Sequence, residues 1–190
     1  LEVNGADAYP LLWEAMKKDE VYSKDKVRFE VMKLFNYFVS ESSEHLSEYL
    51  PYFIKEEQKI KELNIPIREY IRRSIRNTEE YEKRKKVALG EQALPQLERS
   101  TEYASRIIYA METGDHITIH GNVKNKGLIP NLPGDCCVEL PVLVNKNGLQ
   151  ATYFGELPPQ LAAINRMHIG VQELTLKGIF EQRKEYIYHA

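Results

Sequence analysis

The side chains best suited to chemistry gather in one short stretch of the sequence. Those with titratable or hydroxyl groups are Tyr37, Glu41, Ser42, Ser43, Glu44, His45 and Tyr49. Carboxylates accept hydrogen bonds, and imidazole exchanges protons near neutral pH, so this group could relay a proton or hold the hydroxyl groups of a ligand. On the residues alone, a simpler interpretation is that Ser42 or Ser43 caps a helix and that the charged side chains are exposed.

Two other groups of residues carry weaker chemical signals. His116 and His120 share one face of an expected strand, but four residues of a strand, at roughly 3.3 Å each, separate them too far for easy joint ligation. We expect them at an edge or interface. Cys136 and Cys137 lack the spacing of a zinc site and, as neighbours on a strand, point to opposite faces and cannot bridge. We expect core packing, and this cysteine usage suits the reducing cytoplasm.

Composition and charge exclude several classes of protein. The chain has 190 residues, of which 43% are hydrophobic and 28% charged. Those values are ordinary for a globular protein, and the length predicts one compact domain over residues 1–190. The formal charge of −2 gives no excess of basic residues that would bind nucleic acid. Without a run of about 18 apolar residues, no membrane partner is expected.

Motifs for cofactors and metals are missing from the sequence. The ten glycines form no Gly-x-Gly-x-x-Gly, which would let a backbone approach a pyrophosphate. There is also no His-Glu-x-x-His and no paired Cys-x-x-Cys. We therefore assign this chain no cofactor-binding residue and no metal ligand.

The elements that must position these residues begin with helices. Helical spacing predicts helices over residues 10–16, from about 25 to 38, 51–63, 67–89 and 95–111. The second should bury one stripe of apolar residues: Val27, Val31, Leu34, Phe35 and Phe38. Serines compete for backbone hydrogen bonds, so residues 40–44 predict a break between helices. The interleaved charges of residues 68–86 predict a solvated face.

Strands follow the helices. Alternation predicts a strand over residues 116–120, and a β-prone run predicts another over 136–144. Asn147-Gly148 predicts a tight hairpin turn to a third strand. Residues 158–180 return to helical spacing. The fold class predicted is α+β, with helices packed on an antiparallel sheet.

Several motifs together resemble one enzyme family. Residues 122–133 and 135–141 resemble the Asn-Val-x-Asn-x-Gly, Leu-Pro-x-Asp and Val-Glu-x-Pro signature of family 4 glycoside hydrolases. Residues 5–10 resemble its Gly-x-Asp-x-Tyr-Pro, and residues 38–45 resemble its bacterial α-galactosidase branch. The order of the motifs covers the chain from end to end. The resemblance implies a C-terminal domain of the lactate/malate dehydrogenase type, at the end of an enzyme whose N-terminal NAD-binding domain is absent here.

The resemblance also implies a redox route for cleaving α-galactosides. Family members use NAD and a divalent metal, usually Mn²⁺, to oxidise the sugar at C3, which acidifies the C2 proton and permits elimination. Their metal ligands, a cysteine and a histidine, lie upstream of the position that matches Leu1, so neither Cys136 nor Cys137 should inherit that role. The chain alone is expected to be inactive and to bind neither cofactor.

The family's C2 base is a tyrosine or an aspartate on the segment that matches residues 37–45. The aspartate of some α-glucosidases falls near Ser42, which cannot serve as a comparable base. Tyr37, Glu44 and His45 are therefore the candidate catalytic residues, and Glu41 and Ser42 the candidate substrate contacts.

Other functions stay open from the sequence. Within the same family the substrate could be an α-glucoside or an α-galacturonide. The chain could instead be a stand-alone sugar-binding or interaction domain, or a structural domain with a relict resemblance. The enzyme interpretation implies a homo-oligomer in the cytoplasm.

Overall fold

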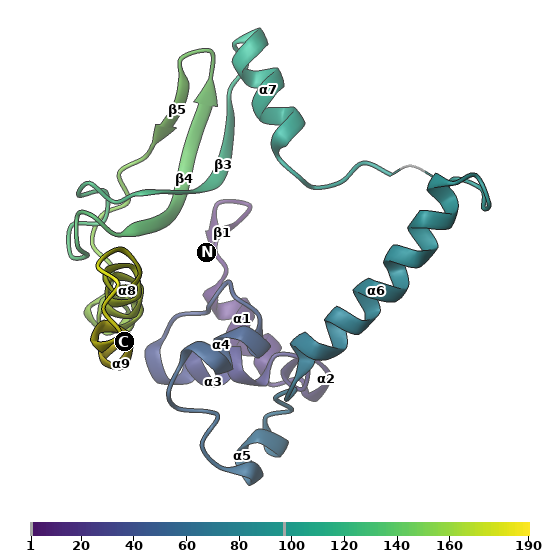
Figure 1. Cartoon of the computed structure of the whole chain (residues 1–190). Helices are drawn as coiled ribbons and strands as arrows, with labels where there is room; N and C mark the ends of the chain where they lie inside the picture. Colours follow the sequence, from purple (N-terminus) through teal and green to yellow (C-terminus); the bar gives the residue numbers. More distant parts are fainter. Residues whose placement is uncertain (1, 97) are drawn as a thin grey trace. The chain divides into compact units, whose positions relative to one another are not determined.

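The computed structural model of the protein describes residues 2–96 and 98–190. The chain divides into two compact units, Leu1–Leu97 and Glu98–Ala190. The first contains mainly helices, and the second contains a three-stranded sheet with helices (Figure 1). None of the described helices combines the length and the apolar character that a membrane span requires.

The first unit begins with a small hairpin and continues with helices. Its elements are β1 (Glu2–Val3), β2 (Ala6–Asp7), α1 (Tyr9–Met16), α2 (Asp19–Tyr22), α3 (Lys26–Phe35), α4 (Ser43–Tyr49), α5 (Glu57–Glu62) and α6 (Glu69–Ala88). Asn4 and Gly5 connect the two strands at positive φ, 52° and 77°, as a type I′ turn requires. Pro10 lies in the first turn of α1, where its missing N–H leaves no hydrogen bond unmade.

The core of the first unit forms where α3 packs on α4. Its buried apolar residues are Ala8, Val27, Phe29, Val31, Met32, Leu46, Leu50, Phe53 and Ile65. Phe29 also contacts Phe38 in the segment that follows α3, with ring centroids 5.4 Å apart. Val27 and Val31 of the predicted stripe are therefore buried, together with Phe29 and Met32, which the predicted stripe did not include.

The second unit is built around an antiparallel sheet in the order β3-β4-β5. Its elements are α7 (Ala104–Thr113), β3 (Ile117–Lys124), β4 (Cys137–Asn145), β5 (Gly148–Ala151), α8 (Pro159–Phe180) and α9 (Glu185–His189). Ile119 pairs with Val142 in the β3–β4 register, and both are buried. Ala110 of α7 and Ile169 of α8 join the same core, so both helices pack on the sheet.

These elements confirm the predicted α+β class, and several local predictions also hold. The break between helices, the helix over 158–180 and the hairpin at Asn147-Gly148 are present. Gly148 has φ of 91°, a conformation that favours glycine. All residues of α6 are exposed or half-buried, which confirms the solvated face.

Other local predictions are wrong. Phe38 lies outside α3 because Asn36 ends that helix in the left-handed conformation, and Leu34 is 64% exposed. The helix predicted over 51–63 is shorter, because residues 51–55 form turns that bury Phe53. The helix predicted from 95 begins only at Ala104. Before it, the backbone N–H of Glu102 donates to Ser100 Oγ, a local bond that competes with helix formation.

Candidate functional site

The predicted site residues lie on the loop that joins α3 to α4 and on the first turns of α4. Asn36, at φ of 64°, ends α3. Ser42 then caps α4, because its Oγ accepts a hydrogen bond from the backbone N–H of His45 at 3.3 Å. The capping interpretation of this serine is therefore correct, and the cap fixes where the side chains of Glu44 and His45 emerge.

Contacts with α3 hold this segment in place. Ser43 Oγ donates to Asp25 Oδ1 at 3.3 Å and accepts a hydrogen bond from the backbone N–H of Arg28 at 3.3 Å. Arg28 Nε donates to the carbonyl of Val39 at 2.9 Å, and the Arg28 guanidinium lies 4.2 Å from the ring centroid of Phe38. The loop is thus fastened at both ends to one helix.

His45 is paired with a residue that the sequence prediction did not include. Its Nδ1 lies 3.1 Å from Oε2 of Glu48, one turn further along α4. Its ring also stacks on Tyr49, with centroids 6.3 Å apart. A carboxylate on one ring nitrogen orients the imidazole. The spacing of three residues between His45 and Glu48 is the signal that could have identified Glu48.

Glu44 has a partner far along the chain. Its Oε2 accepts a hydrogen bond from Arg73 Nη2 of α6 at 2.6 Å. Its side chain is 15% exposed, so this carboxylate is largely shielded from water. The Ser47 hydroxyl donates to the carbonyl oxygen of Glu44 at 2.6 Å. Glu44 is therefore a fixed acceptor rather than a freely moving charge.

The remaining predicted site residues are Tyr37, which contacts a residue of α1, and Glu41, which has a partner next to it in the chain. Tyr37 is 38% exposed and lies edge-on to Tyr9, with ring centroids 6.3 Å apart. Glu41 Oε1 accepts a hydrogen bond from the backbone N–H of Ser42 at 2.7 Å. The structure thus links Glu41 to Ser42 and Ser42 to His45, whereas the described ring contact of Tyr37 is with Tyr9. The catalytic and substrate-binding roles of these residues stay predictions.

Glu44, His45 and Glu48 are also the chain's candidate donors for a metal ion. Their ligand atoms all lie within 4.8 Å of one another, and carboxylate with imidazole is a donor set that transition metals accept. However, Glu44 already forms an ion pair with Arg73, and His45 already contacts the carboxylate of Glu48. Each donor therefore already has a partner within the chain, and the arrangement does not favour a metal centre.

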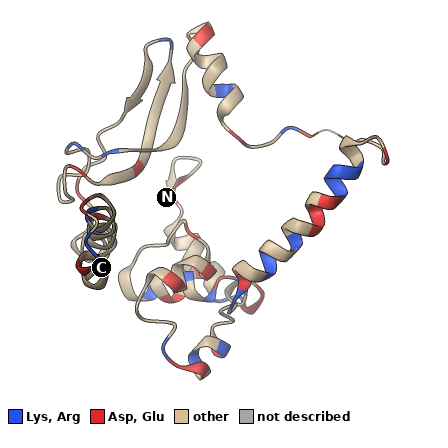
Figure 2. Cartoon of the chain, viewed as in Figure 1, with Lys and Arg blue, Asp and Glu red and all other residues tan. Residues whose placement is uncertain are grey.

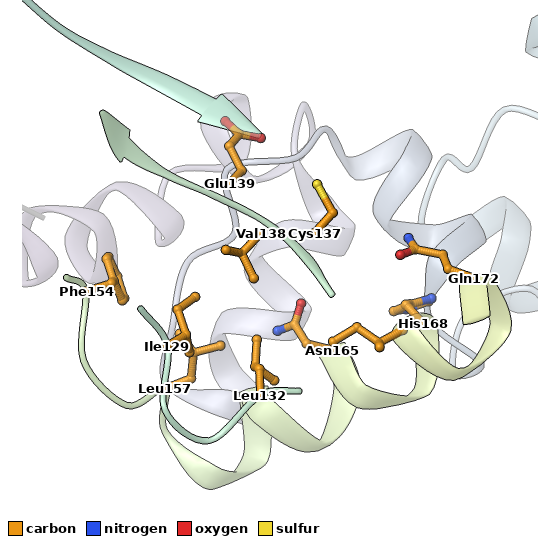
Figure 3. A pocket seen from close by; sticks show the side chains of 11 residues that line it. Ile129, Leu132, Cys137, Val138, Glu139, Phe154, Leu157, Asn165, His168 and Gln172 are labelled. Atoms are coloured by element: carbon orange, nitrogen blue, oxygen red, sulfur yellow. The ribbon is translucent and has the colours of Figure 1, made fainter. Parts of the chain in front are cut away.

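The second unit contains a pocket of about 320 Å³ between the start of β4 and α8 (Figure 3). Its lining residues are Ile129, Leu132, Cys137, Val138, Glu139, Phe154, Leu157, Asn165, His168, Ile169 and Gln172. Figure 3 shows the apolar side chains of Ile129, Leu132, Leu157 and Phe154 together on one side. Asn165, His168 and Gln172 come from α8. The pocket therefore has an apolar side and a polar side.

Two asparagines, Asn125 and Asn131, hold the backbone of the loop that contributes Ile129 and Leu132 to this pocket. Asn125 is fully buried, and its Nδ2 donates to the carbonyls of Ile129, Leu132 and Pro133 at 3.0, 3.2 and 3.0 Å. Asn131 Oδ1 accepts from the backbone N–H of Leu157 at 3.0 Å, while its Nδ2 donates to the same residue's carbonyl at 2.7 Å. Both side chains form hydrogen bonds with backbone groups, so they hold the loop in its conformation rather than contact a ligand.

The structure also places the two histidines and the two cysteines that carried weaker chemical signals in the sequence. His116 and His120 are both exposed on the sheet side that lies away from the core. Cys136 is buried in the core, where burial raises the pKa of its thiol. Cys137 is exposed, so the expectation of core packing is right for one cysteine and wrong for the other. The two side chains point to opposite faces, as alternation along a strand requires.

The sequence is similar to that of a curated α-galactosidase. The chain is 44% identical over 190 residues to an α-galactosidase from Bacillus subtilis. The aligned region covers 98% of this chain and 44% of that protein. It therefore spans less than half the length of that relative.

Known structures share the fold. The crystal structure of LplD from Bacillus subtilis matches with a TM-score of 0.82 at 18% identity, over 99% of this chain and 46% of that one. A 6-phospho-α-glucosidase from gut microorganisms, solved in complex with NAD and Mn²⁺, matches with a TM-score of 0.64 at 17% identity, over 97% of this chain and 45% of that one. The family profile of the family 4 glycosyl hydrolase C-terminal domain matches residues 1–190. The chain therefore belongs to family 4 of the glycosyl hydrolases.

Proposed function

We propose that this chain is the C-terminal, substrate-side part of an α-galactosidase. The observation that carries this proposal is the 44% identity, over nearly the whole chain, to the Bacillus subtilis α-galactosidase. That level of identity favours an α-galactoside over the α-glucosides and α-galacturonides that the sequence left open. A stand-alone binding domain is less consistent with it, because the family profile describes one domain of an enzyme.

In this proposal the start of α4 faces the sugar. His45 offers Nε2 while Glu48 orients its ring through Nδ1, an arrangement suited to holding or moving a proton at a sugar hydroxyl or at C2. Tyr37 and Glu44 remain the other candidate bases, and Glu44 is disfavoured by its ion pair with Arg73. Glu41 and Ser42 are proposed to contact the substrate. The hydroxyl of Ser42 can still donate to a sugar oxygen while its Oγ caps the helix.

The proposed whole enzyme uses NAD and Mn²⁺, which are present in the 6-phospho-α-glucosidase structure. NAD supplies reversible hydride transfer, and the metal supplies Lewis acidity next to the sugar oxygens. The residues of this chain do not fit either group, because no Gly-rich phosphate loop is present in the sequence and the Glu44, His45 and Glu48 donors are paired. We therefore assign both to a separate N-terminal NAD-binding domain.

A chimeric enzyme tests this function. The segment of the Bacillus subtilis α-galactosidase that this chain matches is replaced by residues 1–190, and the product is assayed with a nitrophenyl α-galactoside, NAD, Mn²⁺ and a thiol. We expect hydrolysis that requires both cofactors. The 190-residue chain assayed alone should show no turnover above a blank. A folded chimera that binds NAD and cleaves no α-galactoside would contradict the proposal.

The proposed enzyme is also a homo-oligomer in the cytoplasm. Ile71 and Ile75 form a row on α6, and Ile67 lies just before that helix; each of the three is about half exposed. An exposed apolar row of this kind favours association with a second copy. The exposed thiol of Cys137 suits a reducing compartment, where it would stay unoxidised.

A further inference from the structure

Three arginines, Arg72, Arg73 and Arg76, occupy the first two turns of α6, where Figure 2 shows basic and acidic residues interleaved. Two of them share one acidic partner within the helix. Glu69 accepts hydrogen bonds from Arg72 Nε at 2.7 Å and from Arg76 Nη2 at 2.9 Å. These hydrogen bonds hold the pKa of the Glu69 carboxyl below its usual value.

Arg73 is neutralised mainly by a residue of the proposed site. Its Nη2 donates to Glu44 Oε2 at 2.6 Å, whereas its Nε lies 3.9 Å from Glu69 Oε1, beyond hydrogen-bonding distance. The Arg73 side chain is 44% exposed, against 15% for Glu44. The guanidinium thus reaches the surface, and the neighbouring carboxylate cancels its charge.

A free guanidinium at this position would attract anionic sugars. Arginine binds carboxylates and phosphates with two parallel hydrogen bonds, which makes it the preferred residue for recognising such groups. A guanidinium already bonded to Glu44 offers fewer donors, and the ion pair as a whole carries no net charge. The ion pair therefore disfavours a sugar that carries its own carboxylate.

We propose that Glu44 is a specificity-determining residue: by masking Arg73 next to His45, it makes the site select neutral α-galactosides against α-galacturonides. The inference rests on the proposed function, because it needs the sugar to lie at the start of α4. It assigns Glu44 a role in choosing the substrate rather than in abstracting a proton.

The Glu44→Gln variant of the chimeric enzyme tests the inference. This change keeps the shape of the side chain, removes its charge and frees the Arg73 guanidinium. The measured quantity is the ratio of kcat/KM for a nitrophenyl α-galacturonide to kcat/KM for the matching α-galactoside. We expect this ratio to rise at least about tenfold, which corresponds to about 1.4 kcal/mol of transition-state stabilisation.

Two control variants separate this effect from a general change of charge. Glu80→Gln removes the same charge from another ion pair of α6, the one with Lys83, but leaves the Glu44–Arg73 pair intact, so the ratio should stay near that of the parent chimera. Glu44→Gln combined with Arg73→Gln removes the freed cation, so the gain should be lost. Thermal unfolding of each variant confirms that it is folded.

The outcomes distinguish this inference from the proposed function. An unmodified chimera without α-galactosidase activity would overturn the proposed function. An active chimera whose Glu44→Gln variant folds but shows no rise in the ratio would overturn the masking role of Glu44 alone. A rise of similar size in Glu80→Gln would also overturn it, since general electrostatics would then explain the change.

Discussion

Asn125 and Ile129 exchange two hydrogen bonds in the interior of the second unit. Asn125 Oδ1 accepts from the backbone N–H of Ile129 at 2.7 Å, and Asn125 Nδ2 donates to the carbonyl of Ile129 at 3.0 Å. The same Nδ2 also reaches the carbonyls of Leu132 and Pro133. One buried side chain therefore satisfies four backbone groups of a loop that has no regular structure to satisfy them.

Replacing Asn125 should destabilise the protein severely. The Asn125→Ala variant leaves buried backbone groups without partners, and each such group costs about 1–3 kcal/mol. We expect a loss of at least about 3 kcal/mol in the free energy of unfolding, measured by urea denaturation. Asn165→Ala is the matched control, because Asn165 is exposed and the hydrogen bond that its Nδ2 donates to the carbonyl of Leu161 lies within α8. A similar small loss in both variants would contradict the structural role of Asn125.

Ser42 should contribute to stability through its cap. Removing the hydroxyl in Ser42→Ala leaves the backbone N–H of His45 without its acceptor, so we expect a loss of about 0.5–2 kcal/mol in the free energy of unfolding. Ser42→Asp restores a capping oxygen and should recover most of that loss. An Ala variant as stable as the parent would show that the cap is unimportant.

His45 should affect catalysis more than stability. In the chimeric enzyme, we expect His45→Ala to lower kcat/KM for an α-galactoside at least about tenfold, or about 1.4 kcal/mol, because a group that contacts the reacting sugar is lost. The kcat/KM values of the Tyr37→Phe and Glu44→Gln variants are measured for comparison with that of His45→Ala. A substrate deuterated at C2 identifies the base, since loss of the base should make proton abstraction more rate-limiting and raise the isotope effect. Normal turnover with an unchanged isotope effect in all three variants would exclude all three as the base.

Glu30 should make the first unit sensitive to acid. Burial acts to raise the pKa of its carboxyl, but hydrogen bonds from Lys33 and Tyr22 outweigh burial and hold that pKa below its ordinary value. A lowered pKa stabilises the folded state above the pKa of the unfolded chain, and this stabilisation is lost as the pH falls through the folded-state pKa. Burial and the bond to Glu30 raise the pKa of Tyr22 to about 12, so its proton stays available for that bond.

The matching measurement compares Glu30→Gln with the parent chain. Urea midpoints are measured between neutral pH and about pH 3, a range that spans the ordinary pKa of a glutamate. We expect the difference in stability between parent and variant to shrink as the pH falls. Glu57→Gln, on an exposed surface pair, is the control and should change little. A difference that is constant with pH would contradict the linkage.

The isoleucine row of α6 should mediate self-association. The double change Ile71→Lys and Ile75→Lys places two charges on this row, and we expect it to shift the protein toward the monomer in light scattering at micromolar concentration. Asn77→Lys adds a charge to the same helix away from the row and should leave the association unchanged. A parent chain that is monomeric under these conditions would refute the proposed homo-oligomer.

The sequence by itself determined those features that depend on near neighbours. Asn147-Gly148 predicted a hairpin because the conformation it needs is local, and the spacing along residues 158–180 predicted α8 for the same reason. Alternation placed Cys136 and Cys137 on opposite faces. The helical spacing of the first two thirds and the alternation after it likewise predicted the α+β fold class.

Only the tertiary structure decided which residues distant in the sequence contact each other. Glu44 and Arg73 are 29 residues apart, and no local rule pairs them. The sequence could not show that Asn125 is a buried backbone anchor, because the carbonyls it satisfies belong to an irregular loop. Leu34 has the helical spacing of a core residue but is exposed, since burial depends on which faces of α3 other elements cover. Spacing fixes the direction of a side chain from its own helix, and only packing decides what lies there.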